Sequence, residues 1–344
     1  MRLGIIGCGG ISERHARGAE HSDQVDIVAC CDVRLDAAEG WARRHGCERA
    51  YDDYRAMVHE HQLDGVLLAT WPNQHHEHIL GCLEAGARAI LCEKSLTLTG
   101  AEALEVWRAA TAADALVGEA YMYRHHPAFR LLEETVAKDE IGEVDSVRAA
   151  FTLFDPAEAS EGDPERDWRQ RPDLGGGVPW DLAGYCVDAC NRFGASTPLR
   201  VAAVASESER YGTIDRLFGL IEYENGRIGI VESSKRSDFD HQLRIDGSHG
   251  HALLDVAWRI ETDTEVRVAR STGWGVFETS RMPVASADPY RLQLEHFARA
   301  ARGETAPVPA LADSIVTAFT LDALLRSAAE HEVVPVEAPG VEAA

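Results

Sequence analysis

A glycine-rich turn near the start of the chain has the residue types that can bind a pyrophosphate. The segment Gly7-Cys8-Gly9-Gly10-Ile11-Ser12 follows an apolar run, Leu3–Ile6, and opens a helical pattern. Glycine permits the tight turn and lets a phosphate approach the backbone, and the helix N-terminus adds N–H groups and a partial positive charge. Ser12 departs from the GxGxxG/A pattern but is small enough for close helix–strand packing. We expect dinucleotide contacts from Gly7, Gly9, Gly10 and Ile11.

A carboxylate follows the second apolar run, at the position where a dinucleotide-binding segment has an acidic residue. The second apolar run, Val25–Cys31, ends in Asp32. At this distance along the chain, a carboxylate accepts hydrogen bonds from the adenosine ribose hydroxyls and repels a 2′-phosphate. This predicts NAD as the preferred cofactor. Arg34, two residues further on, could reach a 2′-phosphate, so NADP stays open as an alternative.

A second group of polar residues follows three consecutive glycines, Gly175–Gly177. Pro179 suits the first turn of a helix. Asp181 and Tyr185 then stand four residues apart and therefore on one helix face. A phenol can transfer a proton to or from a reacting hydroxyl. The alternative is that Tyr185 is simply a half-buried aromatic residue.

The first third of the chain alternates short apolar runs with helical patterns, which is typical of βαβ units and a parallel sheet. Helical periodicity is clearest over Leu35–His45 and His76–Ala85. We therefore predict a doubly wound α/β Rossmann domain over residues 1–120. Its strands are expected at Leu3–Ile6, Val25–Cys31, Gly65–Ala69, Ala89–Cys92 and Leu116–Gly118.

The pattern changes in the second part, where the apolar runs alternate as in strands with one exposed face. Asn225-Gly226 and Asp246-Gly247 are predicted turns of β-hairpins. These features predict an α+β domain over residues 121–332 with a large, open, mostly antiparallel sheet, followed by a tail over 333–344. Its strands are expected at Val144–Phe154, Leu217–Glu224, Arg227–Ser234, His241–Ile245 and His251–Val256, and its helices at Tyr290–Arg302 and Leu311–Glu330.

Composition excludes several classes of function. The chain has 344 residues and a formal net charge of −23, which disfavours nucleic acid and anionic membranes as partners. No signal peptide or long apolar run is present, so we expect a cytoplasmic protein with reduced cysteines. The cluster His75-His76-Glu77-His78 lacks the HExxH spacing, and no metal site is expected. Only three of the 34 basic residues are lysines, Lys94, Lys138 and Lys235, so a lysine within a motif is notable.

Together with the glycine turn, three segments resemble the family of glucose–fructose oxidoreductase, inositol dehydrogenase and MocA. The resemblance covers about residues 1–330 and implies a Rossmann domain, an open-sheet domain that often forms a dimer or tetramer interface, and an active site between them. The three segments are Ala69-Thr70-Trp71-Pro72-Asn73-Gln74-His75-His76, Leu91-Cys92-Glu93-Lys94-Ser95 and Gly175-Gly176-Gly177-Val178-Pro179-Trp180-Asp181-Leu182-Ala183-Gly184-Tyr185.

The resemblance implies further cofactor contacts, whereas His75 and His78 are expected to be peripheral. Lys94 matches the family lysine that touches both the nicotinamide ribose and the reacting oxygen. Ser95 stands where the family has a proline, often after a cis bond. Because a cis bond before another residue costs about 2.5–4 kcal/mol, we expect a trans bond here. The implied cofactor contacts are Thr70, Pro72, Asn73, His76, Glu93, Lys94, Trp168 and Arg169.

The spacing Asp-x-x-x-Tyr resembles the branch that contains glucose–fructose oxidoreductase and the dihydrodiol dehydrogenases. This implies that Tyr185 transfers the proton, that Lys94 holds the substrate oxygen and lowers the pKa of the phenol, and that Asp181 positions the substrate or Lys94. Arg124, in a stretch resembling the family's RxHP segment, is a candidate substrate contact or an interdomain structural residue. The predicted substrate contacts are Lys94, Arg124, Asp181 and Tyr185.

These observations predict an NAD(P)-dependent oxidoreductase that transfers a hydride between nicotinamide and a secondary alcohol or ketone of a sugar, cyclitol or related polyol. One alternative is a non-catalytic nucleotide-binding sensor or regulator with the same fold. Another is a lyase or glycosidase that uses NAD for transient oxidation. We expect a homodimer or homotetramer formed through the C-terminal sheet.

Overall fold

The computed structural model describes residues 1–154 and 167–340, which form two compact units. Unit 1 contains Met1–His125 and Asp288–Ile315, and unit 2 contains His126–Ala287 and Val316–Gly340. Each unit has its own sheet, as the two sequence patterns predict.

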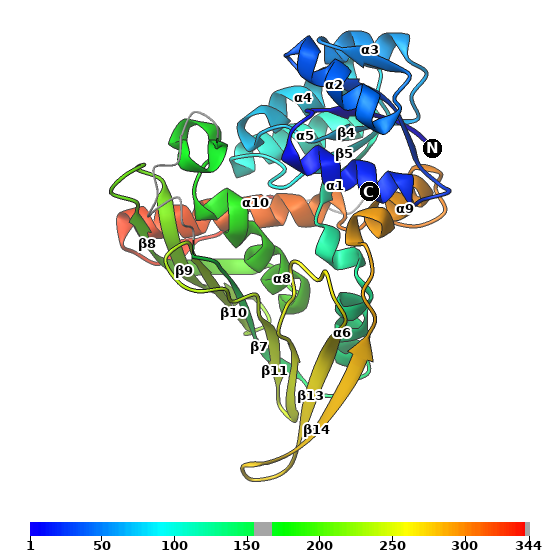
Figure 1. Ribbon diagram of the computed structural model, residues 1–344. Helices are drawn as coiled ribbons and strands as arrows, with labels where there is room; N and C mark the ends of the chain where they lie inside the picture. Colours follow the sequence, from blue (N-terminus) through cyan, green and yellow to red (C-terminus); the bar gives the residue numbers. More distant parts are fainter. Residues whose placement is uncertain (155–166, 341–344) are drawn as a thin grey trace. The chain divides into compact units, whose positions relative to one another are not determined.

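The sheet of unit 1 is parallel, with the strand order β3-β2-β1-β4-β5-β6. Two of its neighbouring strands, β4 and β5, are labelled in Figure 1. The order reverses between β1 and β4, which is the doubly wound topology whose ligands bind at the carboxyl ends of the strands. The five predicted strands are confirmed, and the three-residue β3 was not predicted. The strands are β1 (Arg2–Ile6), β2 (Asp26–Cys31), β3 (Arg49–Tyr51), β4 (Gly65–Leu68), β5 (Ala89–Glu93) and β6 (Leu116–Ala120).

The helices of unit 1 begin and end at residues with clear local reasons. Thr99 and Glu102 form a reciprocal capping box at the start of α5, and Gly46 ends α2 in the left-handed conformation. Pro72 is the first residue of α4, where its missing N–H has no intrahelical partner to lose. The helices are α1 (Gly10–Glu20), α2 (Leu35–His45), α3 (Tyr54–Glu60), α4 (Pro72–Glu84), α5 (Gly100–Ala112) and α9 (Pro289–Ala301), with a 3₁₀ turn η1 (Met122–His125).

Helix α9 belongs to unit 1, although the sequence places it beyond the expected domain boundary. Leu294, Phe297 and Ala298 are buried in the same hydrophobic core as β1 and β2. The helix lies so close to α1 that a Cβ atom at Gly18 would be 2.9 Å from the backbone nitrogen of Arg291. The apolar face formed by these residues is buried in the core of unit 1, and this is the physical reason why α9 belongs to unit 1 and not to unit 2.

The sheet of unit 2 has nine strands in the order β14-β13-β12-β11-β7-β10-β9-β8-β15. Neighbouring strands are antiparallel except for β7 and β10. The strands are β7 (Val144–Thr152), β8 (Pro198–Glu207), β9 (Ile214–Tyr223), β10 (Ile228–Ser234), β11 (Leu243–Gly247), β12 (Gly250–Leu254), β13 (Thr264–Gly273), β14 (Val276–Val284) and β15 (Val334–Pro335). Strands β8, β13 and β14 were not predicted, and β15 lies within the expected tail.

One of the two predicted hairpin turns is displaced. Asn225-Gly226 connects β9 and β10, as predicted. Asp246 and Gly247 instead pair with His251 and Gly250, so the turn residues are Ser248 and His249. The strand register overrides the local turn preference, because Asp246 and Gly247 also pair with β7 on their other side.

Helical segments of unit 2 pack on this sheet, with α8 against β7 and β10. A π-helical turn, η4 (Pro179–Ala183), leads directly into α8 (Gly184–Gly194). The other segments are α6 (Pro127–Ala137), the 3₁₀ turns η2 (Trp168–Gln170) and η3 (Pro172–Leu174), and α10 (Leu311–Glu330), whose first residues belong to unit 1.

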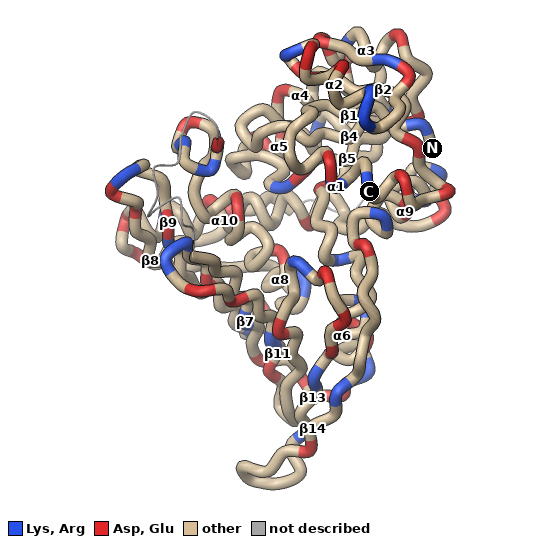
Figure 2. Tube along the Cα trace, viewed as in Figure 1, with Lys and Arg blue, Asp and Glu red and all other residues tan. Residues whose placement is uncertain are grey.

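Acidic and basic residues are interleaved along both units rather than segregated (Figure 2). Within the described part of the chain, no helix has the length and apolarity that a membrane span requires.

Candidate active site

The glycine turn after β1 leaves an open backbone at the start of α1. Gly7 has φ +94° and donates its N–H to Cys31 O over 2.8 Å, so it holds the turn. A Cβ atom at Gly7 would lie 2.6 Å from Ala69 O, whereas one at Gly9 or Gly10 would meet no described atom within 4 Å. No side chain within the described part of the chain caps the helix. Free backbone N–H groups and open space are what a pyrophosphate requires.

Ser12 and Ile11 complete this turn. Ser12 is fully buried and donates from Oγ to Gly9 O over 2.5 Å, which agrees with close packing of the helix on the sheet. Ile11 is half-buried against the core of unit 1.

Asp32 lies at the carboxyl end of β2, and two backbone groups fix its carboxylate. Its Oδ2 accepts from the N–H of Cys8 and its Oδ1 from the N–H of Arg34, each over 3.0 Å. The hydrogen bond from Cys8 connects the carboxylate of Asp32 directly to the glycine turn. Arg34 is exposed at the N-cap of α2.

Glu93, at the end of β5, is held by a residue that sequence reasoning missed. Its Oε1 lies 2.7 Å from His15 Nε2 on α1, and both side chains are buried. The His15 ring packs edge-on against Tyr290 of α9 at 5.1 Å. Glu93 therefore joins α1 to β5, and its Oε2 accepts from the backbone N–H of Lys94 over 3.3 Å.

The peptide bond between Lys94 and Ser95 is cis, so the predicted trans bond is wrong. Partners distant in sequence hold this segment. Ser95 O lies 2.7 Å from His75 Nδ1, and Leu96 N–H donates to Glu119 Oε1 over 2.8 Å. These partners lie on α4 and β6. The intrinsic preference for a trans peptide bond before serine is a local property, so it could not predict contacts with them.

His75, which the resemblance places peripheral to the cofactor contacts, is a central structural residue of unit 1. It is fully buried, with Nδ1 near Ser95 O and Nε2 3.0 Å from Thr70 O. Burial lowers the pKa of His75, and both ring nitrogens face backbone carbonyl oxygens, which accept hydrogen bonds. His75 thus connects the segments that follow β4 and β5.

The remaining residues of the α4 segment lie in different surroundings. Thr70 Oγ1 is 3.1 Å from His78 Nδ1. Pro72 is buried at the first position of α4, and Asn73 is exposed. His76, a predicted cofactor contact, lies 2.9 Å from Glu105 of α5.

In unit 2, the buried carboxylate of Asp181 meets two cations. Arg169 Nε donates to Asp181 Oδ2 over 3.0 Å, and Lys235 Nζ lies 3.9 Å from the same oxygen. The negative charge of Asp181 raises the pKa of the Arg169 guanidinium further above its usual range. Asp181 lies in the π-helical turn η4, a local widening of the helix that is frequent at functional sites.

Lys235 is the residue of this cluster that sequence reasoning did not assign. It directly follows β10, and only 3% of its surface is exposed. Its backbone N–H donates to Asp215 O over 2.9 Å. The scarcity of lysine in the chain was the available signal, since a chain that uses arginine almost throughout has lysine at this buried position.

Tyr185 lies four residues after Asp181, on α8, and is buried among aromatic rings. Its ring centroid is 5.4 Å from that of Phe151 on β7 and 6.0 Å from that of Trp258. Trp258 donates its indole N–H to Ala150 O over 2.7 Å, which fixes the ring.

Two further predicted residues have structural partners. Arg124 is buried in unit 1, where its Nη1 lies 3.4 Å from Asp313 Oδ2. In unit 2, the guanidinium of Arg169 lies 4.9 Å from the ring centroid of Trp168, and Asp167 caps the short η2 turn.

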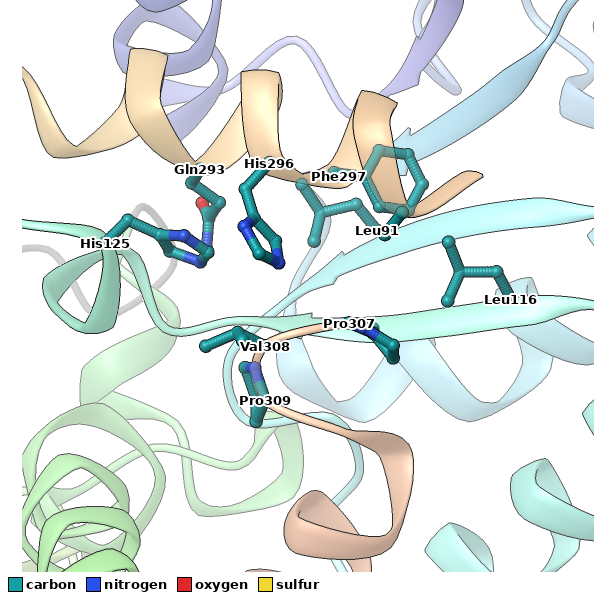
Figure 3. A pocket seen from close by; sticks show the side chains of 11 residues that line it. Leu91, Leu116, His125, Gln293, His296, Phe297, Pro307, Val308 and Pro309 are labelled. Atoms are coloured by element: carbon teal, nitrogen blue, oxygen red, sulfur yellow. The ribbon is translucent and has the colours of Figure 1, made fainter. Parts of the chain in front are cut away.

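Unit 1 also contains a small hollow between α9 and the β5–β6 edge of the sheet (Figure 3). The rings of His125 and His296 are 5.0 Å apart there, above Val308 and Pro309. None of the predicted cofactor or catalytic residues lines it. Its lining residues are Leu91, Leu116, Gly118, His125, Gln293, His296, Phe297, Ala300, Pro307, Val308 and Pro309.

Comparison with known proteins places both units in one family. The profile of an oxidoreductase family with an NAD-binding Rossmann fold matches residues 1–121, and the profile of the GFO/IDH/MocA C-terminal domain matches residues 129–253. The chain is 29% identical to a D-xylose 1-dehydrogenase (NADP(+)) of Haloferax volcanii over 328 residues, 95% of this chain and 97% of the relative. It is 31% identical to an uncharacterized oxidoreductase of Rhizobium meliloti over 336 residues, again 95% and 97%.

A solved structure has the same fold. A 3-ketoreductase from Actinomadura kijaniata, in complex with NADP and TDP-benzene, aligns with a TM-score of 0.84 and 23% identity over 95% of this chain and 97% of that chain. The matched profiles, the relatives and the two sheets agree with the resemblance of the sequence motifs: the chain belongs to the Gfo/Idh/MocA family of oxidoreductases.

Proposed function

We propose that this chain is a nicotinamide-dependent oxidoreductase that interconverts a secondary alcohol and a ketone on a sugar, cyclitol or related polyol. The observation that carries the proposal is the pairing of Asp181 with two cations in the helical segment that bears the buried Tyr185. A protein that only senses a nucleotide has no need for a buried carboxylate and phenol. The activity of the D-xylose dehydrogenase relative supports the substrate class.

The cofactor half of the site is proposed in unit 1. Gly7, Gly9, Gly10 and Ile11 would hold the pyrophosphate, and Asp32 would accept hydrogen bonds from the adenosine ribose. Arg34 lies two residues beyond Asp32. We propose that NAD is preferred, because the fixed carboxylate of Asp32 would repel a 2′-phosphate. Further contacts are proposed from Thr70, Pro72, Asn73, His76, Glu93, Lys94, Trp168 and Arg169, of which Thr70, His76, Glu93 and Arg169 have the protein partners described above.

Three residues are proposed to act on the substrate. When bound, the nicotinamide accepts or supplies the hydride. In oxidation, Tyr185 as the phenolate takes the hydroxyl proton and becomes the phenol, while Lys94 holds that oxygen and Asp181 positions the substrate or Lys94. In reduction, the phenol returns the proton. Arg124 remains a further proposed substrate contact, although its pairing with Asp313 also gives it a structural role.

The test is turnover of a panel of aldoses and cyclitols with NAD⁺ and NADP⁺, followed at the nicotinamide absorbance band. We expect Tyr185→Phe to lower kcat by about 10²–10⁴-fold, since general acid–base assistance contributes about that much, and Lys94→Ala to lower it at least as much. Cofactor affinity should change little in Tyr185→Phe. A packing role for Tyr185 would instead leave kcat and its pH profile near those of the wild type.

The panel also separates the two alternatives. A nucleotide sensor would bind cofactor and turn over nothing. A lyase or glycosidase with transient oxidation would form product with no change in absorbance.

We further propose that the chain forms a homodimer or homotetramer through the sheet of unit 2. The support is a row of exposed apolar side chains on one face of β8 and β9, where Val204 and Phe218 are directly opposed and Leu220 follows. Phe218→Glu should convert the oligomer to a smaller species in analytical sedimentation. A wild-type protein that itself sediments as a monomer would contradict the proposal.

A further inference from the structure

His15 is a fully buried imidazole on the inner face of α1, and the proposed reaction gives it no role. A polar ring in an apolar core is costly unless its nitrogens are hydrogen-bonded, whereas a leucine would fill the position without that cost. Nε2 of the ring lies 2.7 Å from Glu93 Oε1, and Nδ1 has no partner among the described residues. The contact with Glu93 is therefore the interaction that can explain a histidine at this position.

The hydrogen bonds of Glu93 connect His15 to Lys94. We assign the ring proton of His15 to Nε2, because an N–H at Nδ1 would be buried with no acceptor among the described residues. Nε2 then donates to Oε1 of Glu93, and Oε2 accepts from the backbone N–H of Lys94 over 3.3 Å. One oxygen of this buried carboxylate is thus held by α1 and the other by the first residue after β5.

The segment around Lys94 is held on both sides by buried side chains. On the amino side, the ring of His15 is restricted by Tyr290 of α9, which packs edge-on against it with an angle of 87° between the rings. On the carboxyl side, Ser95 O lies 2.7 Å from Nδ1 of the buried His75. Lys94 itself is half-buried, so its backbone lies between two fixed points.

We propose that His15 is a positioning residue for hydride transfer, which fixes the backbone of Lys94 through the carboxylate of Glu93. The inference rests on the proposed function, in which Lys94 holds the reacting oxygen. His15 transfers no proton and is assigned no contact with substrate or cofactor. A misplacement of about 1 Å in an active site can lower the rate about 10²-fold, so a residue remote from the reacting atoms can have an effect of that size.

The first test removes the donor of His15 and then restores it. His15→Leu should lower kcat by about 10–100-fold, while the dissociation constant of the cofactor, measured by tryptophan fluorescence, changes little. His15→Gln should recover most of kcat, because the amide nitrogen of glutamine is as far along the side chain as Nε2. Asparagine is one bond shorter, so His15→Asn should not recover it. This polar pair also keeps the test open if the leucine variant fails to fold.

The second test asks whether His15 acts through Lys94. In a Lys94→Ala background, His15→Leu should lower kcat no further, because residues that act as a unit are not additive. A ring that only stabilises the fold would lower thermal stability and leave kcat per folded molecule unchanged. Ala19→Gly is the control for stability, since it weakens the same helix at a buried position one turn further on, and its kcat should equal that of the wild type.

The outcomes separate this inference from the proposed function. With an active wild type, an unchanged kcat in folded His15→Leu overturns the role of His15. Equal kcat values in the glutamine and asparagine variants, or a full further loss in the Lys94→Ala background, overturn it as well. A wild type that turns over no member of the sugar and cyclitol panel overturns the proposed function instead.

Discussion

Asp32 receives its two hydrogen bonds from the backbone, so its carboxylate is already oriented before any ligand binds. Such preorganisation reduces the ordering cost of binding. We expect Asp32→Ser to weaken NAD⁺ binding by roughly 10–100-fold, the range for losing a charge-assisted hydrogen bond, and to strengthen NADP⁺ relative to NAD⁺.

Dissociation constants for both cofactors, from tryptophan fluorescence, would measure this effect. The control is Asp36→Ser, since Asp36 is exposed in the first turn of α2 and should leave the ratio unchanged. Tighter binding of NADP⁺ by the wild type would refute the preference.

Lys235 and Arg169 contact the same oxygen of Asp181, so the lysine should act through that carboxylate. Lys235→Met should lower kcat/KM by about 10–100-fold, as expected for a lost charge-assisted interaction. In an Asp181→Asn background the same change should have little further effect, because contacting residues that act as a unit are not additive.

Steady-state kinetics of the four proteins would measure the coupling between Lys235 and Asp181. Lys138→Met is the control, because Lys138 is exposed and pairs only along its own helix with Glu134 among the described residues. Full additivity of the two changes would show that Lys235 acts independently of Asp181.

At the scale of elements, the contact between α1 and α9 can be tested at one glycine. Replacing a helical glycine with alanine usually stabilises by about 0.5–1 kcal/mol. At Gly18 the sign should reverse, to a loss of about 1–3 kcal/mol, because the new Cβ would lie 2.9 Å from a backbone atom of α9.

Gly40, on α2, is the matched control. Its added Cβ would meet only the flexible ends of two arginine side chains, the nearest at 3.7 Å, so Gly40→Ala should be stabilising. Denaturant titration of both variants gives the comparison, and equal gains in the free energy of unfolding would mean that α1 and α9 pack less closely.

These elements also show what the sequence could predict. Helices α2 and α10 begin and end at the predicted residues, because a sustained 3.6-residue period is a local property. Strand β3 is too short for a period to appear. The cis bond at Ser95 and the partnership of Lys235 with Asp181 depend on segments distant in the chain, and no local pattern encodes such contacts. The glycine turn after β1, the place of Asp32 after β2 and the placing of Asp181 and Tyr185 on one helical segment could be predicted, because these residue types and spacings are local; their roles stay predictions.

At the scale of the whole molecule, buried histidines set a dependence of stability on pH. The pKa values of His126 and His241 are lowered from 6.5 to about 4 by burial. The unfolded chain takes up protons at these residues below about pH 6.5, whereas the folded chain does so only near pH 4. The free energy of unfolding is therefore fully retained above about pH 6.5 and falls between that pH and 4, by up to about 1.4 kcal/mol per pH unit for each group.

Denaturant titrations of the wild type and His241→Phe at several values across this range would measure the difference. The variant should lose stability less steeply, because it has one such group fewer. Parallel curves would indicate that His241 titrates normally in the folded protein.

The position of α9 determines when unit 1 can finish folding during synthesis. Residues Met1–His125 leave the ribosome long before Asp288–Ile315, yet Leu294, Phe297 and Ala298 complete their hydrophobic core. The nascent Rossmann segment must therefore keep an apolar surface exposed while the whole of β7–β14 is synthesised, a period in which such surfaces are prone to aggregation. Unit 1 is complete only near the end of translation, and a gene fragment cut after His125 would encode an unfinished domain.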